Sequence, residues 1–167
     1  MSRVVFALGS NLGDRLANLA AAVQAIRAAV RLEAISPVYE TDPVGGPAGQ
    51  PAYLNAVVVA DSAAAPEELL RLVQEWEAAA HRVRTERWGP RTLDVDIITV
   101  DGTRSESAEL TLPHPRAYER AFVLVPWADV EPDAVLPGHG RVGDLAAAID
   151  ASGVHRRDDL DLGSAGR

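Results

Sequence analysis

Residues 92–100 read TLDVDIITV, and this short stretch sets the geometry around it. The composition predicts a β-strand, along which side chains alternate between two faces. Leu93, Val95 and Ile97 are then expected to point into a core. Asp94 and Asp96 share the opposite face, about 6–7 Å apart at their Cα atoms. Two carboxylates at this spacing repel each other unless they face water or share a cation.

The segments around this strand alternate between strands and helices. Apolar residues at three- and four-residue steps predict a helix from about Asp14 to Ala29, and Pro66 begins a second helix. The Asp101-Gly102 pair predicts a hairpin turn. The expected strands cover residues 3–8, 31–41, 53–60, 92–100 and, more weakly, 108–112. The order β-α-β-β-α-β predicts an α+β fold with a ferredoxin-like core, in which helices pack on one face of an antiparallel sheet and a C-terminal extension follows.

Length and composition limit the classes of protein to consider. The 167 residues fit one domain, which we expect to cover residues 1–152 and to be followed by a flexible polar tail at 153–167. Without cysteine there is no disulfide and no thiolate nucleophile. No apolar run reaches the roughly 18–20 residues that span a bilayer, so we expect a cytoplasmic monomer with no membrane partner. The net charge of −8 argues against a nucleic-acid partner.

The basic residues are concentrated just ahead of the paired acids. All 16 are arginines, and Arg82, Arg84, Arg87 and Arg91 fall within ten positions. Arginine presents a rigid fork of donors that suits phosphate or carboxylate, and paired carboxylates suit Mg²⁺ bound to substrate phosphates. The combination favours phosphoryl-type transfer. Two other interpretations stay open at this point: a solvated acidic face on the strand, or a surface network of Arg–Asp ion pairs.

Several segments together resemble the 6-hydroxymethyl-7,8-dihydropterin pyrophosphokinase family. RWGPRTLDVDII at 87–98 is similar to the family signature. Five further segments are similar to family segments in the same order: FALGSNLGDR, YETDPVG, QPAYLNAV, PEELL and LPHPRAYERAFVL. The resemblance extends from about residue 4 to about residue 148.

The resemblance implies transfer of a pyrophosphoryl group from ATP to the hydroxymethyl group of the dihydropterin, with release of AMP, in folate biosynthesis. Two Mg²⁺ ions would neutralise the triphosphate, held by Asp94 and Asp96. Arg82 and Arg91 would be the arginines that contact the phosphates during transfer. The implied ATP-binding residues are Gln74, Glu77, Arg84, Ile98, Thr111, His114 and Arg120.

The same resemblance implies a pterin site, and residue chemistry supports part of it. A flat bicycle with hydrogen-bonding edges needs an aromatic slot with a few placed polar groups. Tyr53 and Asn55 share one face of the predicted strand at 53–60, and an asparagine amide both donates and accepts. Taken alone, Tyr53 would more often be ordinary core packing, and the same holds for Phe122. The implied pterin-binding residues are Thr41, Asp42, Val44, Tyr53, Asn55, Trp88 and Phe122.

Two alternatives belong to other functional classes. A ferredoxin-like ligand-binding module that has lost its chemistry would lack the acids or the arginines, yet both are present. A different Mg²⁺-dependent phosphoryl or nucleotidyl transferase would lack the aromatic slot. One position departs from the resemblance: Glu109 stands where some family members have an arginine that holds ATP, and Arg104 is the nearest residue that could compensate.

Overall fold

The computed structural model describes residues 1–42, 51–80 and 92–163. The helices are α1 (Arg15–Ala29), α2 (Pro66–Ala79), α3 (Ala121–Val130) and α4 (Val142–Ala148), with a 3₁₀ turn η1 (Ala117–Glu119). The strands are β1 (Ser2–Ser10), β2 (Arg31–Ile35), β3 (Tyr39–Thr41), β4 (Tyr53–Ser62), β5 (Asp94–Val100), β6 (Ser105–Glu106), β7 (Thr111–Leu112), β8 (Val135–Leu136), β9 (Gly140–Arg141) and β10 (Val154–Arg156). None of the helices described is long and apolar enough to pass through a membrane.

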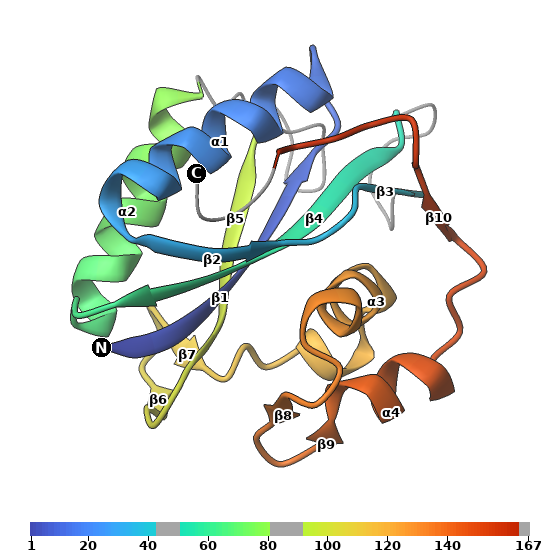
Figure 1. Ribbon diagram of the computed structural model, residues 1–167. Coiled ribbons are helices and arrows are strands. Elements are labelled where there is room, and N and C mark those ends of the chain that lie inside the picture. Colours follow the sequence, from blue (N-terminus) through green and yellow to red (C-terminus); the bar gives the residue numbers. More distant parts are fainter. Residues whose placement is uncertain (43–50, 81–91, 164–167) are drawn as a thin grey trace.

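One antiparallel sheet runs through the centre of the molecule (Figure 1). Its order is β10-β3-β4-β1-β5, and β2 also pairs with β4. β1 lies between β4 and β5, and every neighbouring pair is antiparallel. The predicted α+β class and antiparallel sheet are therefore confirmed, while the ferredoxin-like description remains an interpretation of this strand order.

Helices α1 and α2 cover one face of the sheet. Asp14 caps α1, since its carboxylate accepts a hydrogen bond from the Ala17 amide at 3.1 Å. Pro66 occupies the first turn of α2, as predicted. Phe6 on β1 is fully buried beneath these helices and packs edge-to-face on Trp76 of α2, with ring centroids 5.5 Å apart.

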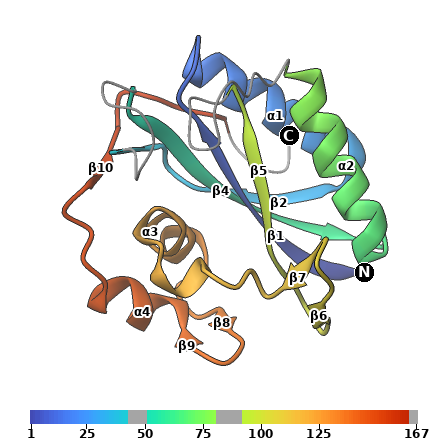
Figure 2. The ribbon, with the colours of Figure 1, turned by 180° about the vertical axis from the view of Figure 1, so that it is seen from behind.

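The two core helices lie on one face as predicted, and the second face is covered by helices of the C-terminal extension. Helices α3 and α4 pack there, as Figure 2 shows from behind. Val123, Leu124 and Trp127 of α3 are all buried. The apolar residues of α3 form no single stripe, because the helix lies between the sheet and α4, and Pro126 interrupts it. Sequence periodicity therefore could not assign this segment.

The hairpin predicted at Asp101-Gly102 is wrong in its pairing. The turn itself forms, with Gly102 at a positive φ of 75° and the Thr103 amide bonded to the Val100 carbonyl. The next strand, β6, pairs with β7 rather than with β5. The outer edge of β5 already has other partners: its Ile98 carbonyl accepts from the His114 amide at 2.8 Å.

The segment expected to be a flexible tail contains a strand of the main sheet. β10 pairs with β3, and Leu162 beyond it is 8% exposed in the core beneath α1 and α2. The polar composition of this segment hid the strand, because pairing with a free sheet edge uses backbone groups and needs little apolar side-chain area.

Candidate functional site

Asp94 and Asp96 lie on β5 as the sequence predicts. Val95 and Ile97 are buried beneath α1 and α2, so the two aspartates share the face toward α3. One oxygen of Asp96 lies 3.7 Å from the Arg120 guanidinium. The amide of Val95, between the two acids, faces the open edge of the sheet and donates to the Glu77 carboxylate of α2 at 3.0 Å.

Tyr53, Asn55 and Thr41 come together on the same face of the sheet. Thr41 on β3 is the register partner of Tyr53 on β4. The Thr41 hydroxyl donates to Asn55 Oδ1 at 2.6 Å, and both side chains are buried. The Asn55 amide nitrogen lies 3.4 Å from the Leu8 carbonyl. This second contact is long, so a planar ligand can compete for the amide.

Gly9 links the amide to the acids and was not among the predicted site residues. Its Cα partner on β4 is Asn55, and its partner on β5 is Asp94. A Cβ added here would lie 2.9 Å from the Asn55 amide nitrogen and 3.4 Å from a ring carbon of Tyr53. In the sequence, Gly9 follows a run of apolar residues and resembles an ordinary turn glycine. Only the pairing of β1 with β4 and β5 shows that it lies between Asn55 and Asp94.

Three predicted ligand residues gather beside Asp96. Arg120 is the N-cap of α3, and its guanidinium lies 5.5 Å from the centre of the Phe122 ring. His114 Nδ1 accepts from the Arg116 amide at 3.2 Å. Burial lowers the pKa of His114; Asp96 acts against this shift, and Arg120 and Arg116 add to it. The lowered pKa favours the neutral ring, and a neutral ring that accepts at Nδ1 carries its proton at Nε2.

The other predicted residues are more scattered. The Thr111 hydroxyl of β7 donates to the Ser107 carbonyl at 3.2 Å. Gln74 is exposed on α2, while the Ile98 side chain is fully buried under α3. Asp42 follows β3, and its amide bonds to the Gly153 carbonyl. The remaining predictions lie outside the described residues: Val44, Arg82, Arg84, Trp88 and Arg91.

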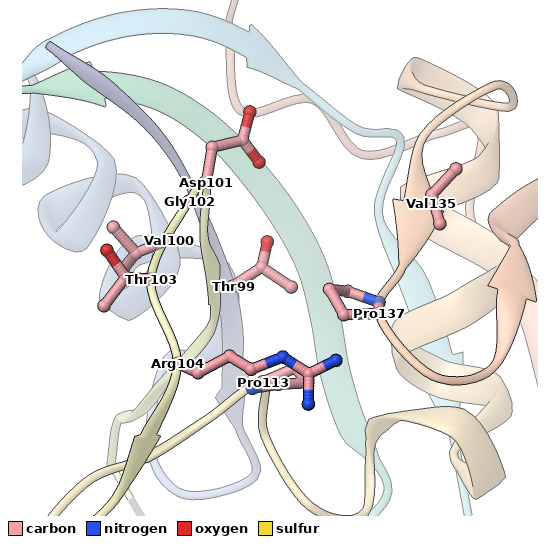
Figure 3. A pocket seen from close by; sticks show the side chains of 9 residues that line it. All are labelled: Thr99, Val100, Asp101, Gly102, Thr103, Arg104, Pro113, Val135 and Pro137. Atoms are coloured by element: carbon pink, nitrogen blue, oxygen red, sulfur yellow. The ribbon is translucent and has the colours of Figure 1, made fainter.

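A surface cavity of about 320 Å³ lies at the other end of β5 (Figure 3). Its lining includes Thr99, Arg104 and Pro113, together with Val135 and Pro137 from the β8–β9 region. None of the residues predicted to bind pterin, ATP or metal belongs to it. Two of its lining residues are adjacent in sequence to predicted ATP-binding residues: Pro113 precedes His114, and Thr99 follows Ile98.

The donor set at Asp94 and Asp96 fits magnesium. Both are hard oxygen donors on one strand face. Within the part of the chain that the structure describes, no group of three or more His, Cys, Asp or Glu side chains gathers that could enclose a metal by itself. Substrate phosphates and water would have to complete the shell, and this is how Mg²⁺ commonly binds in phosphoryl-transfer sites.

Paired carboxylates, an arginine and a buried amide on a single face of an antiparallel sheet suit a transferase that binds a magnesium–phosphate substrate beside a hydrogen-bonding ligand. Residues 5–132 match the model of the 7,8-dihydro-6-hydroxymethylpterin-pyrophosphokinase (HPPK) family, and the chain belongs to that family.

Two relatives illustrate how similar the sequences are. The 2-amino-4-hydroxy-6-hydroxymethyldihydropteridine pyrophosphokinase of Mycobacterium tuberculosis is 51% identical over 81% of this chain and 76% of its own length. The protein of the same name from Methylorubrum extorquens is 42% identical over 93% of this chain and 99% of its own length.

A solved structure supports the fold. The crystal structure of Plasmodium falciparum HPPK-DHPS wild type with SDX-DHP matches 88% of this chain with a TM-score of 0.65 and 14% identity. This chain spans 43% of the length of that protein.

Proposed function

We propose that this chain transfers a pyrophosphoryl group from ATP to the hydroxymethyl group of 6-hydroxymethyl-7,8-dihydropterin, giving AMP and the pterin diphosphate, a step of folate biosynthesis. One observation carries the proposal: Asn55 and Asp94 are the cross-strand partners of one residue, Gly9. Neighbouring strands lie about 4.8 Å apart, so the Cα atoms of Asn55, which would bind the pterin, and Asp94, which would bind the metal, are about 10 Å apart. A bicycle held at Asn55 can thus extend its hydroxymethyl arm to phosphates held at Asp94.

On the pterin side, Asn55 supplies the hydrogen-bonding amide, and Thr41 orients it. With Oδ1 held by the Thr41 hydroxyl, the amide cannot rotate freely, which lowers the entropy lost on binding. Tyr53 and Phe122 would offer ring surfaces on either side of the ligand. Asp42, Val44 and Trp88 complete the proposed pterin set.

On the nucleotide side, Asp94 and Asp96 would hold two Mg²⁺ ions between the sheet and the triphosphate. When bound, these ions would neutralise phosphate charge and increase the acidity of the attacking hydroxyl. Arg120 and the neutral His114 ring lie beside Asp96 and can donate to phosphate or ribose oxygens. The remaining proposed ATP ligands are Gln74, Glu77, Arg84, Ile98 and Thr111.

In the reaction, the pterin hydroxyl oxygen bonds to the β-phosphorus of ATP. The bond from that phosphorus to the oxygen bridging the α-phosphorus breaks, AMP departs with the electron pair, and the hydroxyl proton passes to solvent. Arg82 and Arg91 are proposed to contact the phosphates during this transfer, which is helped chiefly by positioning and electrostatics.

We further infer that the active species is a monomer that works in the cytoplasm, with the chemistry contained in residues 1–152. All the residues proposed to bind ATP, metal and pterin belong to one chain. Sedimentation at assay concentration tests this inference.

Product analysis tests the proposed activity. The chain is incubated with ATP and Mg²⁺, with and without hydroxymethyldihydropterin, and nucleotides and pterins are separated by chromatography. AMP and pterin diphosphate in equal amounts, formed only with the pterin, support the proposal. ADP or free pyrophosphate would indicate another transferase, and pterin binding without turnover would indicate a binding module.

A further inference from the structure

β3 carries Thr41 and depends on neighbours at both edges. It has only three residues, and it lies between β4 and β10. The register aligns Thr41 with Tyr53 on one side and with Val154 on the other. A strand this short is stable only while its pairing partners hold it. We call residues 153–162, which contain β10 and continue toward α1 in Figure 1, the C-terminal strap.

Backbone bonds fasten the strap at both ends of β3. The Asp42 amide bonds to the Gly153 carbonyl at 3.3 Å, just after β3. The Arg157 amide bonds to the Val38 carbonyl at 2.8 Å, just before it. The strap thus restrains β3 along its full length.

A half-buried ion cluster adds a side-chain contact. Glu40 of β3 accepts from Arg15 of α1 at 2.8 Å, and Arg157 of the strap lies 3.3 Å from the same carboxylate oxygen. The same nitrogen of Arg15 also donates to the Ala52 carbonyl, directly before Tyr53. These side chains are 27–32% exposed, so the cluster is less screened than a surface pair.

We propose that the C-terminal strap positions the pterin slot, with Arg157 acting through Glu40 and β3 on the Thr41–Asn55 hydrogen bond. The inference rests on the proposed function, since it assigns Asn55 to the pterin. Arg157 is a positioning residue and touches no substrate. The strap lies beyond residues 5–132, the part of the chain that the family model matches, so the family match does not supply this role.

The test compares two charge reversals in the full-length chain. Arg157→Glu places a carboxylate against Glu40 and breaks the more exposed pair of Arg157 with Asp159. Arg141→Glu is the control for reversing a charge in an exposed ion cluster: Arg141 of β9 pairs with Asp133, which precedes β8, and with Asp144 of α4. We expect Arg157→Glu to raise the KM for the pterin about threefold to tenfold, the range of one partly buried charge contact. The KM for ATP and kcat should stay within about twofold, as should all constants of Arg141→Glu, and Arg157→Lys should recover most of the pterin KM.

A double-mutant cycle shows whether the effect passes through Thr41. Thr41→Val removes the hydrogen bond to Asn55, so adding Arg157→Glu to it should raise the pterin KM by less than the product of the two single effects. Additive effects, an unchanged pterin KM, or equal changes in the ATP and pterin constants would each overturn the proposal. If Arg157→Glu does not fold, Glu40→Gln makes the same comparison.

Hydrogen exchange separates this proposal from the proposed function. Amides at residues 39–42 should exchange faster in Arg157→Glu than in wild type, and not in Arg141→Glu. If exchange is faster in Arg157→Glu but the wild-type chain has no pyrophosphokinase activity, the proposed function is refuted, while the proposal that the strap restrains β3 is supported. Unchanged exchange with an active wild type would refute the strap alone.

Discussion

The same strands form both faces of the sheet, but the side chains at one end of the strands differ between the two faces. Toward α1 and α2, the apolar run of β1 continues through Val4, Phe6 and Leu8. Toward α3, it goes from Val5 and Ala7 to a glycine, and the neighbouring strands replace apolar residues with polar ones at the same level.

This difference shows which part of the sheet can carry polar groups that bind a ligand. A continuous apolar face secures helices and leaves no donor or acceptor for a ligand. The second face is buried by α3 and α4 over part of its length, and polar groups begin where that cover ends. Stability and ligand binding should therefore respond separately to changes on the two faces.

Phe6→Ala tests the continuous face and should have the largest effect. Removing a fully buried ring that contacts Trp76 should lower the free energy of unfolding by about 3–5 kcal/mol. Urea unfolding monitored by circular dichroism measures it. The KM values of the protein that remains folded should change less than twofold, and a loss below about 1 kcal/mol would mean that the two faces do not differ in this way.

Asp96→Asn tests the polar end of the other face. We expect kcat to fall at least about a hundredfold, since even residues that only orient metal ligands cost 10–100-fold when mutated. The free energy of unfolding should change by less than about 1 kcal/mol, because the carboxylate is partly exposed and its ion pair is long.

Asp101→Asn is the matched control. Asp101 directly follows β5, at the end of the strand away from Asp94, and the variant should retain wild-type kcat. Near-normal turnover of Asp96→Asn at ordinary Mg²⁺ would contradict the assignment of the acids.

Much of this contrast could be predicted from the sequence. Strand alternation correctly placed Asp94 and Asp96 on one face and Tyr53 and Asn55 on one face, because the two-residue period of a strand is local. That all four point to the same side of the sheet depends on register, which the chain order does not give. Gly9 was missed for this reason.

Helix α3 and strand β10 were harder to predict than α1 and α2. Residues 121–130 are apolar with an internal proline, so neither a helical nor a strand period stands out, and only packing between the sheet and α4 selects the helix. β10 is short and polar and forms because β3 offers a free edge. Both failures concern segments whose structure is determined by distant partners.

Gly9→Ala examines the junction between the amide and the acids. The new Cβ would push the Asn55 amide against its hydrogen bond with Thr41, so we expect the loss of stability to be about that of one hydrogen bond, roughly 0.5–1.5 kcal/mol. The pterin KM should rise about tenfold or more, since displacements near 1 Å at a binding group are costly. In an Asn55→Ala background the same substitution should add little, and a full effect there would show that the clash with Asn55 is not the cause.

Tyr39→Phe tests the contact between β3 and α3 at the border of the second face, and of the four substitutions it should have the smallest effect on the reaction. The Tyr39 hydroxyl donates to the Asp129 carboxylate of α3, and burial together with that hydrogen bond raises the pKa of Tyr39 to about 12. Folding then favours the protonated phenol, so this contribution to stability is complete below pH 10 and is lost as the pH rises to about 12. At pH 8 the variant should be about 1–2 kcal/mol less stable than wild type in urea unfolding. The difference should shrink steadily between pH 10 and 12, and a gap independent of pH over that range would show that the phenol proton is not what holds α3 to β3.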